Sequence, residues 1–208
     1  MSRRVVITGM GAVTPLGTGV DKFWAGVTAN KIGFSYIDKF DTEGTGIKIA
    51  GIVRDFDETV YYNVAGCFDK KEAKRMDMFT KYAVVSAHEA LEDAGTDFSD
   101  IDCYRAGVIV GSGIGGIDLT LSEYSKYLEK GPNRISPFYI PMMISNMAAG
   151  TIERNRRSFK IITFCKCLHI GKSCKGEFYT CAFSTAGKTY IKITVLYFPE
   201  CFSDRVGS

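Results

Sequence analysis

The pattern of apolar and polar residues along the chain predicts strands and helices in alternation. Short apolar runs at 3–8 and 106–110 are typical of strands. Apolar residues recur at three- and four-residue steps over 20–29, 70–94 and 118–128, which predicts three amphipathic helices. This alternation favours an α/β layered domain.

The predicted helix boundaries are supported by capping residues. Asp69 and Glu72 have the spacing of a capping box at the start of the longest predicted helix, and Gly95 stands where that helix is expected to end. Trp24, the single tryptophan, falls on the apolar side of the first predicted helix, so we expect it in the core. Residues 47–53 alternate weakly and predict a strand or one arm of a hairpin.

Two glycine clusters follow the two predicted strands. The first is expected to form a turn after the opening strand, and the second ends the strand at 106–110 with a backbone that another group can approach closely. Neither cluster favours a dinucleotide site. The first lacks the third glycine of the Rossmann pattern, and the second is part of a longer motif, GSGIGG at 111–116, that resembles another kind of protein. The clusters are Gly9, Gly11, Pro15 and Gly17, and then Gly111, Gly113, Gly115 and Gly116.

Composition narrows the class of protein without identifying it. An apolar content of 46% with 24% charged residues is ordinary for a globular chain of 208 residues. No apolar run approaches the roughly 20 residues needed to cross a bilayer, and the run after Arg4 is too short for a secretory signal. We therefore expect a cytoplasmic protein with reduced thiols, with no membrane segment, no nucleic-acid partner and no cofactor.

Charge and cysteine content both change near Gly150. Residues 1–150 hold 16 Lys and Arg against 19 Asp and Glu, whereas residues 151–208 hold 10 against 4. Of the seven cysteines, only Cys67 and Cys103 precede the change. The two parts therefore differ in charge balance and in cysteine content, and we place a boundary between 1–150 and 151–208.

Three motifs before that boundary resemble one family. RRVVITGMGAVTPLG at 3–17, GSGIGG at 111–116 and ISPFYIPMMISNMAAG at 135–150 are similar to the first half of the β-ketoacyl-acyl-carrier-protein synthases. The resemblance implies the amino-terminal half of a thiolase-like fold. It also implies a homodimeric enzyme that condenses an acyl thioester with malonyl-acyl-carrier protein in fatty acid elongation, with acyl carrier protein as its partner.

The resemblance also assigns candidate substrate-binding residues. Ile114 corresponds to the side chain that gates the acyl-chain tunnel, and Tyr139, Ile140 and Met143 correspond to residues by which the dimer partner lines that tunnel. Simple core packing is the alternative interpretation for all four apolar side chains.

We expect no catalytic residue in this chain. The family's nucleophile is a cysteine among small residues, at the start of a buried helix that favours the thiolate. Cys165 follows Phe164 instead of a small residue, and Gly171 comes too late for the turn. The resemblance further implies two histidines and a lysine from the second half of the enzyme. Here the only histidines are His88, inside a predicted helix, and His169.

Residues 151–208 are expected to be an unrelated, out-of-frame extension without a periodic segment, and the isolated chain is expected to be inactive. Two alternatives stay open. One is a non-catalytic ketosynthase-like partner subunit. The other is a small metal-binding protein, although the cysteine spacing does not match a structural zinc site and we expect no bound metal. Its candidate ligands are Cys165, Cys167, His169, Cys174 and Cys181.

Overall fold

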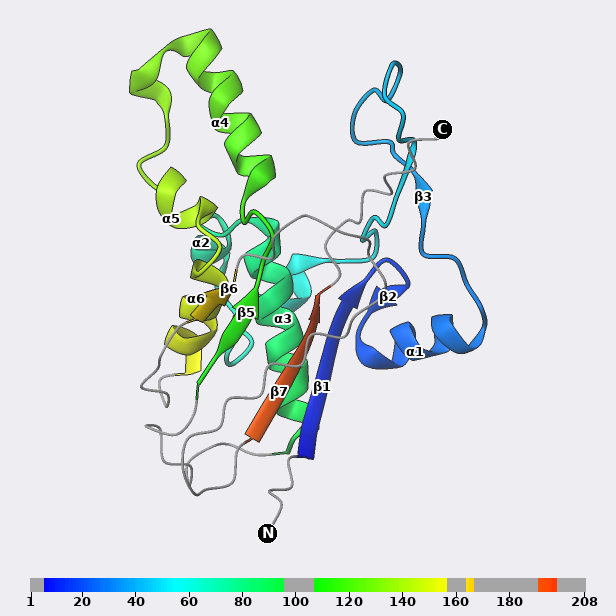
Figure 1. Ribbon diagram of the computed structural model, residues 1–208. Coiled ribbons are helices and arrows are strands. Elements are labelled where there is room, and N and C mark those ends of the chain that lie inside the picture. The colour runs from blue at the N-terminus through cyan, green and yellow to red at the C-terminus, as the bar shows by residue number, and fades with distance from the viewer. Residues whose placement is uncertain (1–5, 96–106, 157–163, 167–190, 198–208) are drawn as a thin grey trace.

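The computed structural model describes residues 6–95, 107–156, 164–166 and 191–197, and it shows helices packed on short sheets (Figure 1). Helix α3 packs on β1 and β7, α6 packs on α3 and β5, and α1 contacts β1 and β2. The strands are β1 (Val6–Thr14), β2 (Gly17–Thr18), β3 (Ser35–Tyr36), β4 (Ile49–Ala50), β5 (Ile109–Gly111), β6 (Phe164–Lys166) and β7 (Ile191–Tyr197). The helices are α1 (Val20–Thr28), α2 (Lys70–Ala73), α3 (Met78–Asp93), α4 (Ile117–Lys130), α5 (Tyr139–Met143) and α6 (Met147–Arg156), with 3-10 turns η1 (Glu58–Tyr61) and η3 (Pro132–Arg134).

Strand β1 continues through the first glycine cluster, so the turn predicted at Gly9 and Gly11 is wrong. A methyl group on Gly9 would lie 2.0 Å from the carbonyl oxygen of Ala90, and one on Gly11 would lie 1.9 Å from that of Ser86. The glycines are needed because α3 packs backbone to backbone on the strand. The chain turns only after Thr14, where β2 pairs antiparallel with the end of β1.

Two carboxylates of α3 hold the backbone of β1. Asp93 accepts a hydrogen bond from the Met10 amide at 2.9 Å, and Glu89 accepts one from the Ala12 amide at 2.8 Å. The second oxygen of Glu89 accepts from the Val20 amide at 2.7 Å. Helix α1 has no side-chain cap of its own, so Glu89 supplies one from another helix.

The long helix predicted over 70–94 is two helices, which corrects that prediction. The capping box of Asp69 and Glu72 is confirmed, but α2 ends at Ala73. Asp77 then adopts an extended conformation, with φ −74° and ψ 162°, and its side chain caps α3. The apolar period is uninterrupted because Met76, in the break between the helices, is itself buried. Gly95 follows the end of α3 with φ 62°, as the sequence predicts.

Trp24 is exposed, which contradicts its prediction as a core residue. Helix α1 forms where expected, but 62% of the surface of Trp24 is accessible. The prediction failed because α1 buries only its Gly26 side, against Leu16. Segment 47–53 does contribute a hairpin arm, since β4 pairs antiparallel with β3.

The core lies between α3, α6 and β5. Ala148 and Ala149 of α6 are completely or almost completely buried. His88 is also buried, and its Nε2 lies 3.3 Å from a carboxylate oxygen of Glu92 one turn later in the helix. This helical position agrees with a structural role for His88.

Two strands come from the segment after Gly150. Strand β6 pairs in parallel with β5, and β7 pairs in parallel with β1 from Val6 opposite Ile191 to Val13 opposite Tyr197. The expectation of no periodic segment in 151–208 is therefore wrong at β7. Of the candidate metal ligands, Cys167, His169, Cys174 and Cys181 lie outside the described residues.

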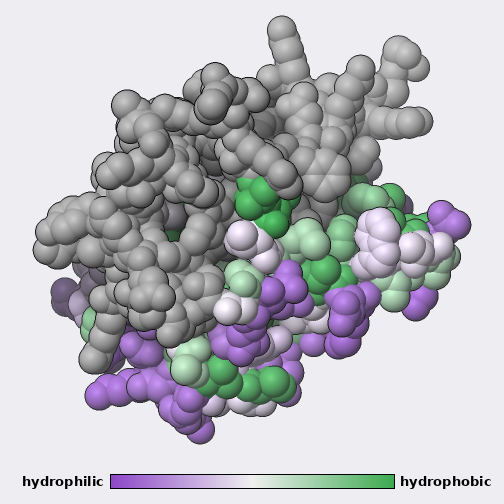
Figure 2. Space-filling model, turned by 90° about the horizontal axis from the view of Figure 1, so that it is seen from below, coloured by the Kyte–Doolittle hydropathy of each residue, from purple (hydrophilic) through white to green (hydrophobic). Residues whose placement is uncertain are grey.

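Exposed apolar side chains lie on several elements, among them β1, α1 and the segments 32–40 and 114–140. On the face seen from below, hydrophobic and hydrophilic side chains form separate small patches (Figure 2). By contrast, α4 and α5, which project at the upper left of Figure 1, carry several exposed apolar residues: Ile117, Leu121, Tyr124, Tyr127, Leu128 and Ile140. Among the described helices, none combines the length and apolar character needed to span a bilayer.

Candidate functional site

The second glycine cluster forms a tight turn between β5 and α4. Gly115 has φ 87°, and a methyl group there would lie 2.2 Å from the carbonyl oxygen of Met143. The Gly116 amide donates a hydrogen bond to that same oxygen at 2.9 Å, and the Gly115 amide donates to the hydroxyl of Ser112 at 3.0 Å. The close approach that the sequence predicts is confirmed, and the approaching group is the backbone of α5.

The turn presents Ile114 to solvent. Its accessible fraction is 59%, and that of Ile140 on α5 is 55%. Met143 is half-buried, and its backbone carbonyl accepts the hydrogen bond from the Gly116 amide of the glycine turn. The predicted residues thus occupy two joined elements, with Ile114 on the turn and the other three on the helix that the turn contacts.

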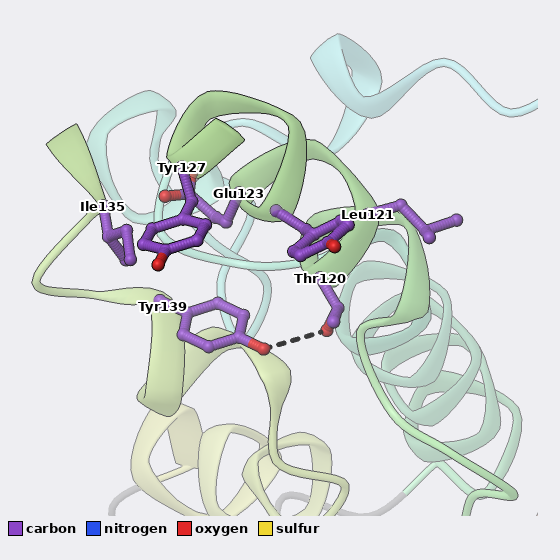
Figure 3. Close-up of a pocket in the computed structure, with 7 residues that line it drawn as sticks. Thr120, Leu121, Glu123, Tyr127, Ile135 and Tyr139 are labelled. Carbon is purple, nitrogen blue, oxygen red and sulfur yellow. Dashed lines mark hydrogen bonds between the residues drawn. The ribbon is translucent and has the colours of Figure 1, made fainter. Parts of the chain in front are cut away.

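Next to this junction lies an open pocket of about 360 Å³ between α4, the segment after it and the start of α5 (Figure 3). Tyr139 lines the pocket, and its hydroxyl donates a hydrogen bond to Thr120 Oγ1 at 3.4 Å. Of the four predicted residues only Tyr139 lines this pocket. The full lining is Thr120, Leu121, Glu123, Tyr124, Tyr127, Ile135 and Tyr139.

Glu123 is a buried carboxylate beside the pocket that sequence reasoning missed. It is 3% exposed and accepts hydrogen bonds from Lys126 Nζ at 2.6 Å and from the Ser136 amide at 2.7 Å. The Lys126 ammonium, followed by the Ser136 N–H, holds the pKa of Glu123 below its ordinary value. The carboxylate ties the segment before α5 to α4. The only sequence signal was the i, i+3 spacing to Lys126.

Cys165 lies within strand β6, where it is opposite Val110 of β5. The strand continues to Lys166. The family setting implied by the resemblance is a cysteine after a strand, at the start of a helix. The position of Cys165 inside a strand differs from that setting. Among the described residues no cluster of His, Cys, Asp and Glu has the geometry to hold a metal ion.

The family model "Beta-ketoacyl synthase, N-terminal domain" matches residues 2–155. The chain belongs to the β-ketoacyl synthase family. Its motifs identified the family correctly, and the match ends five residues after the Gly150 boundary that the sequence suggests.

Several curated relatives of this β-ketoacyl synthase chain carry the same name. The chain is 42% identical over 152 residues to 3-oxoacyl-[acyl-carrier-protein] synthase 2 of Staphylococcus aureus strain N315. This match covers 73% of the chain and 35% of the relative. The chain is 40% identical to the proteins of that name from Vibrio harveyi and from Synechocystis. The chain therefore spans about a third of the length of the curated relatives that it matches.

Solved ketosynthase structures share the fold. The ishigamide ketosynthase/chain length factor matches with a TM-score of 0.68 at 28% identity, over 79% of this chain and 40% of that one. A β-ketoacyl synthase from Burkholderia phymatum STM815 matches with a TM-score of 0.60 at 22% identity, over 78% and 39%. The described elements are thus the amino-terminal part of a thiolase-like ketosynthase fold.

Proposed function

We propose that residues 1–150 form part of the acyl-binding site of a 3-oxoacyl-[acyl-carrier-protein] synthase. The complete enzyme condenses an acyl thioester with malonyl-acyl-carrier protein in fatty acid elongation. The observation that carries the proposal is the family match over residues 2–155 together with 42% identity to the Staphylococcus aureus enzyme. The same proposal assigns the protein to the cytoplasm, where thiols are kept reduced.

Within that site, Ile114 gates the acyl chain, and Tyr139, Ile140 and Met143 line the tunnel from the dimer partner. Two features support this assignment. The glycine turn that carries Ile114 is joined to α5 of the same chain through Gly116 and Met143, so the gate of one tunnel is linked to the residues that line the tunnel of the partner subunit. Ile114 and Ile140 are also more than half exposed, which leaves them available to a substrate or a second subunit.

A homodimer and an acyl carrier protein complete the proposed assembly. The exposed apolar residues of α4 and α5 supply the kind of surface that a second subunit buries. One solved relative, with a TM-score of 0.60 and 24% identity, is a ketosynthase in complex with its type II polyketide acyl-carrier protein. By analogy, the partner of this chain in catalysis is an acyl carrier protein.

Residues 151–208 are proposed to be unrelated to the family and to come from another reading frame. The family match ends at residue 155, the charge balance reverses there, and five of the seven cysteines follow. Because Cys165 lies in a strand, it lacks the helix start that would stabilise its thiolate. We infer that it is not the nucleophile and that the chain by itself does not condense acyl thioesters.

A graft tests the acyl-binding proposal. Residues 1–150 would replace their counterpart in the Staphylococcus aureus relative, and the product lengths would be measured with acyl-carrier-protein substrates. We expect an active chimera in which Ile114→Phe shortens the longest acyl chain accepted. Ile32→Phe serves as the control because Ile32 is 82% exposed and lies outside α4 and α5. Equal product lengths for both variants would contradict the assignment of Ile114.

A second experiment tests Cys165. The purified chain would be incubated with acyl- and malonyl-acyl-carrier protein, with the full-length Staphylococcus aureus relative as positive control. We expect neither acylation of Cys165 by mass spectrometry nor release of carbon dioxide. Translation of the coding DNA after Gly150 in the other two frames is expected to yield the family's nucleophilic cysteine among small residues. Acylated Cys165 together with condensation would overturn the proposal.

A further inference from the structure

Asp77 caps its own helix in the usual way. It is the N-cap residue of α3, and its Oδ1 accepts a hydrogen bond from the Phe79 amide at 3.4 Å. An N-cap carboxylate satisfies one of the amides that the first helical turn leaves without a partner.

The same carboxyl group also meets the start of α4, which is distant in the chain. Helix α4 begins after Gly116, which has no side chain and provides no cap. The amide of Leu119, in the first turn of α4, lies near enough to the Asp77 carboxyl to lower its pKa. The second oxygen of Asp77 lies so close to Gly116 that a methyl group there would be 2.9 Å from it. One carboxyl group therefore caps α3 and contacts the start of α4.

Arg75 makes a parallel contact with α5. Its guanidinium carbon lies 4.6 Å from the centroid of the Phe138 ring, and Phe138 is the N-cap residue directly before α5. Between Arg75 and Asp77, Met76 is buried in the core. The break between α2 and α3 thus contacts the starts of both helices that border the pocket.

We propose that Asp77 is a positioning residue, which sets the glycine turn and α4 relative to α5 through its contact with Gly116 at the start of α4, with Arg75 fixing the start of α5. The expected effect on acyl-chain binding rests on the proposed function, whereas the contacts of Asp77 do not depend on it. Loss of this contact would loosen the turn that carries Ile114, and with it the site for the acyl chain.

The capping role depends on an oxygen acceptor and does not need a charge. Burial raises the pKa of Asp77 above its ordinary value, against the lowering effect of the Phe79 and Leu119 amides, and the nearby Asp118 raises it further. An asparagine offers the same acceptor oxygen without the cost of burying a carboxylate.

Three substitutions in the full chain distinguish the N-cap of α3 from the contact with the start of α4. Asp77→Asn keeps an acceptor for both helices. Asp77→Ser keeps a good N-cap for α3, but its shorter side chain does not reach Leu119. Asp69→Ala is the matched control, because Asp69 caps α2 by accepting hydrogen bonds from the Lys71 and Glu72 amides of that same helix.

Two measurements decide the question. Hydrogen exchange of the Leu119 amide, resolved by NMR, is expected to rise roughly fivefold to tenfold in Asp77→Ser and to stay unchanged in Asp77→Asn and Asp69→Ala. Titration calorimetry with the dodecanoyl thioester of N-acetylcysteamine should show weaker binding in Asp77→Ser alone.

Unchanged exchange in Asp77→Ser, or an equal rise in Asp69→Ala, would overturn the positioning role. If exchange rises while thioester affinity stays constant, the link from Asp77 to the acyl site is refuted. Failure of the unsubstituted chain to bind the thioester would count against the proposed function instead, and the exchange comparison would still test the contact between Asp77 and the start of α4.

Discussion

Gly11 of β1 lies against the main-chain carbonyl of Ser86 in α3, so closely that a methyl group on Gly11 would be 1.9 Å from the carbonyl oxygen. Backbone, not side chain, forms this part of the contact between strand and helix. Any side chain at position 11 must push the helix away, and the hydrogen bonds from β1 to Glu89 and Asp93 depend on the same approach.

Gly11→Ala is therefore expected to lower the free energy of unfolding by about 1–3 kcal/mol or more, as overpacking does. Urea denaturation followed by circular dichroism measures the change. Gly46→Ala is the control, because nothing lies within 4 Å of a methyl group there. It should be neutral or slightly stabilising, since it mainly restricts the unfolded chain. Equal stability for both variants would show that α3 does not pack on β1 as described.

Lys81 and Glu58 form an ion pair that joins η1 to α3. The Lys81 side chain is 11% exposed, that of Glu58 is 33% exposed, and Tyr62 donates a hydrogen bond to Glu58 at 2.6 Å. Lys81→Met should cost about 1–3 kcal/mol, because Glu58 loses its partner but keeps some access to water. The double variant Lys81→Met/Glu58→Gln should recover part of the loss. A double variant as unstable as the sum of the single variants would contradict this coupling.

Glu123 should make stability depend on pH in the acid range. Its pKa is lowered by Lys126 and by the Ser136 amide, so its contribution is complete above its ordinary pKa and is lost as the pH falls through the lowered value. Glu123→Gln should cost about 1–3 kcal/mol near neutral pH, because hydrogen bonds to a charged group are lost. The difference should narrow on acidification, as measured by urea midpoints from neutral to acid pH.

Glu129→Gln is the control for that series, since Glu129 lies exposed on the same helix. It should change stability by less than about 0.5 kcal/mol at every pH. If Glu123→Gln behaves in the same way, Glu123 does not hold the segment before α5 against α4.

Trp24 should behave as a surface residue. At 62% exposure, the single tryptophan is accessible to iodide, so its fluorescence should be quenched in the folded chain almost as strongly as in urea. Trp24→Ser should change the free energy of unfolding by no more than about 0.5 kcal/mol. Protection from iodide would instead restore the core position that the sequence suggested.

Much of the fold could be predicted because its signals are local. The capping box of Asp69 and Glu72, the helix end at Gly95 and the amphipathic α1 follow from neighbouring residues alone. The break at Asp77 could not be predicted, because buried Met76 continues the apolar period across it. The candidate site shows the same division. Motifs pointed to Tyr139, whereas nothing local marked Glu123 as buried.

The sequence by itself determined the family, since its motifs at 3–17, 111–116 and 135–150 are short, ordered and independent of distant contacts. Only the tertiary structure showed that the glycines allow backbones to pack closely, and which carboxylates hold one element against another. Gly11 meets Ser86, and Asp77 meets Gly116 at the start of α4, although both pairs are far apart along the chain. Such contacts arise when whole helices and strands pack together. The two residues are far apart in the sequence, so no local pattern of apolar and polar residues predicts their contact.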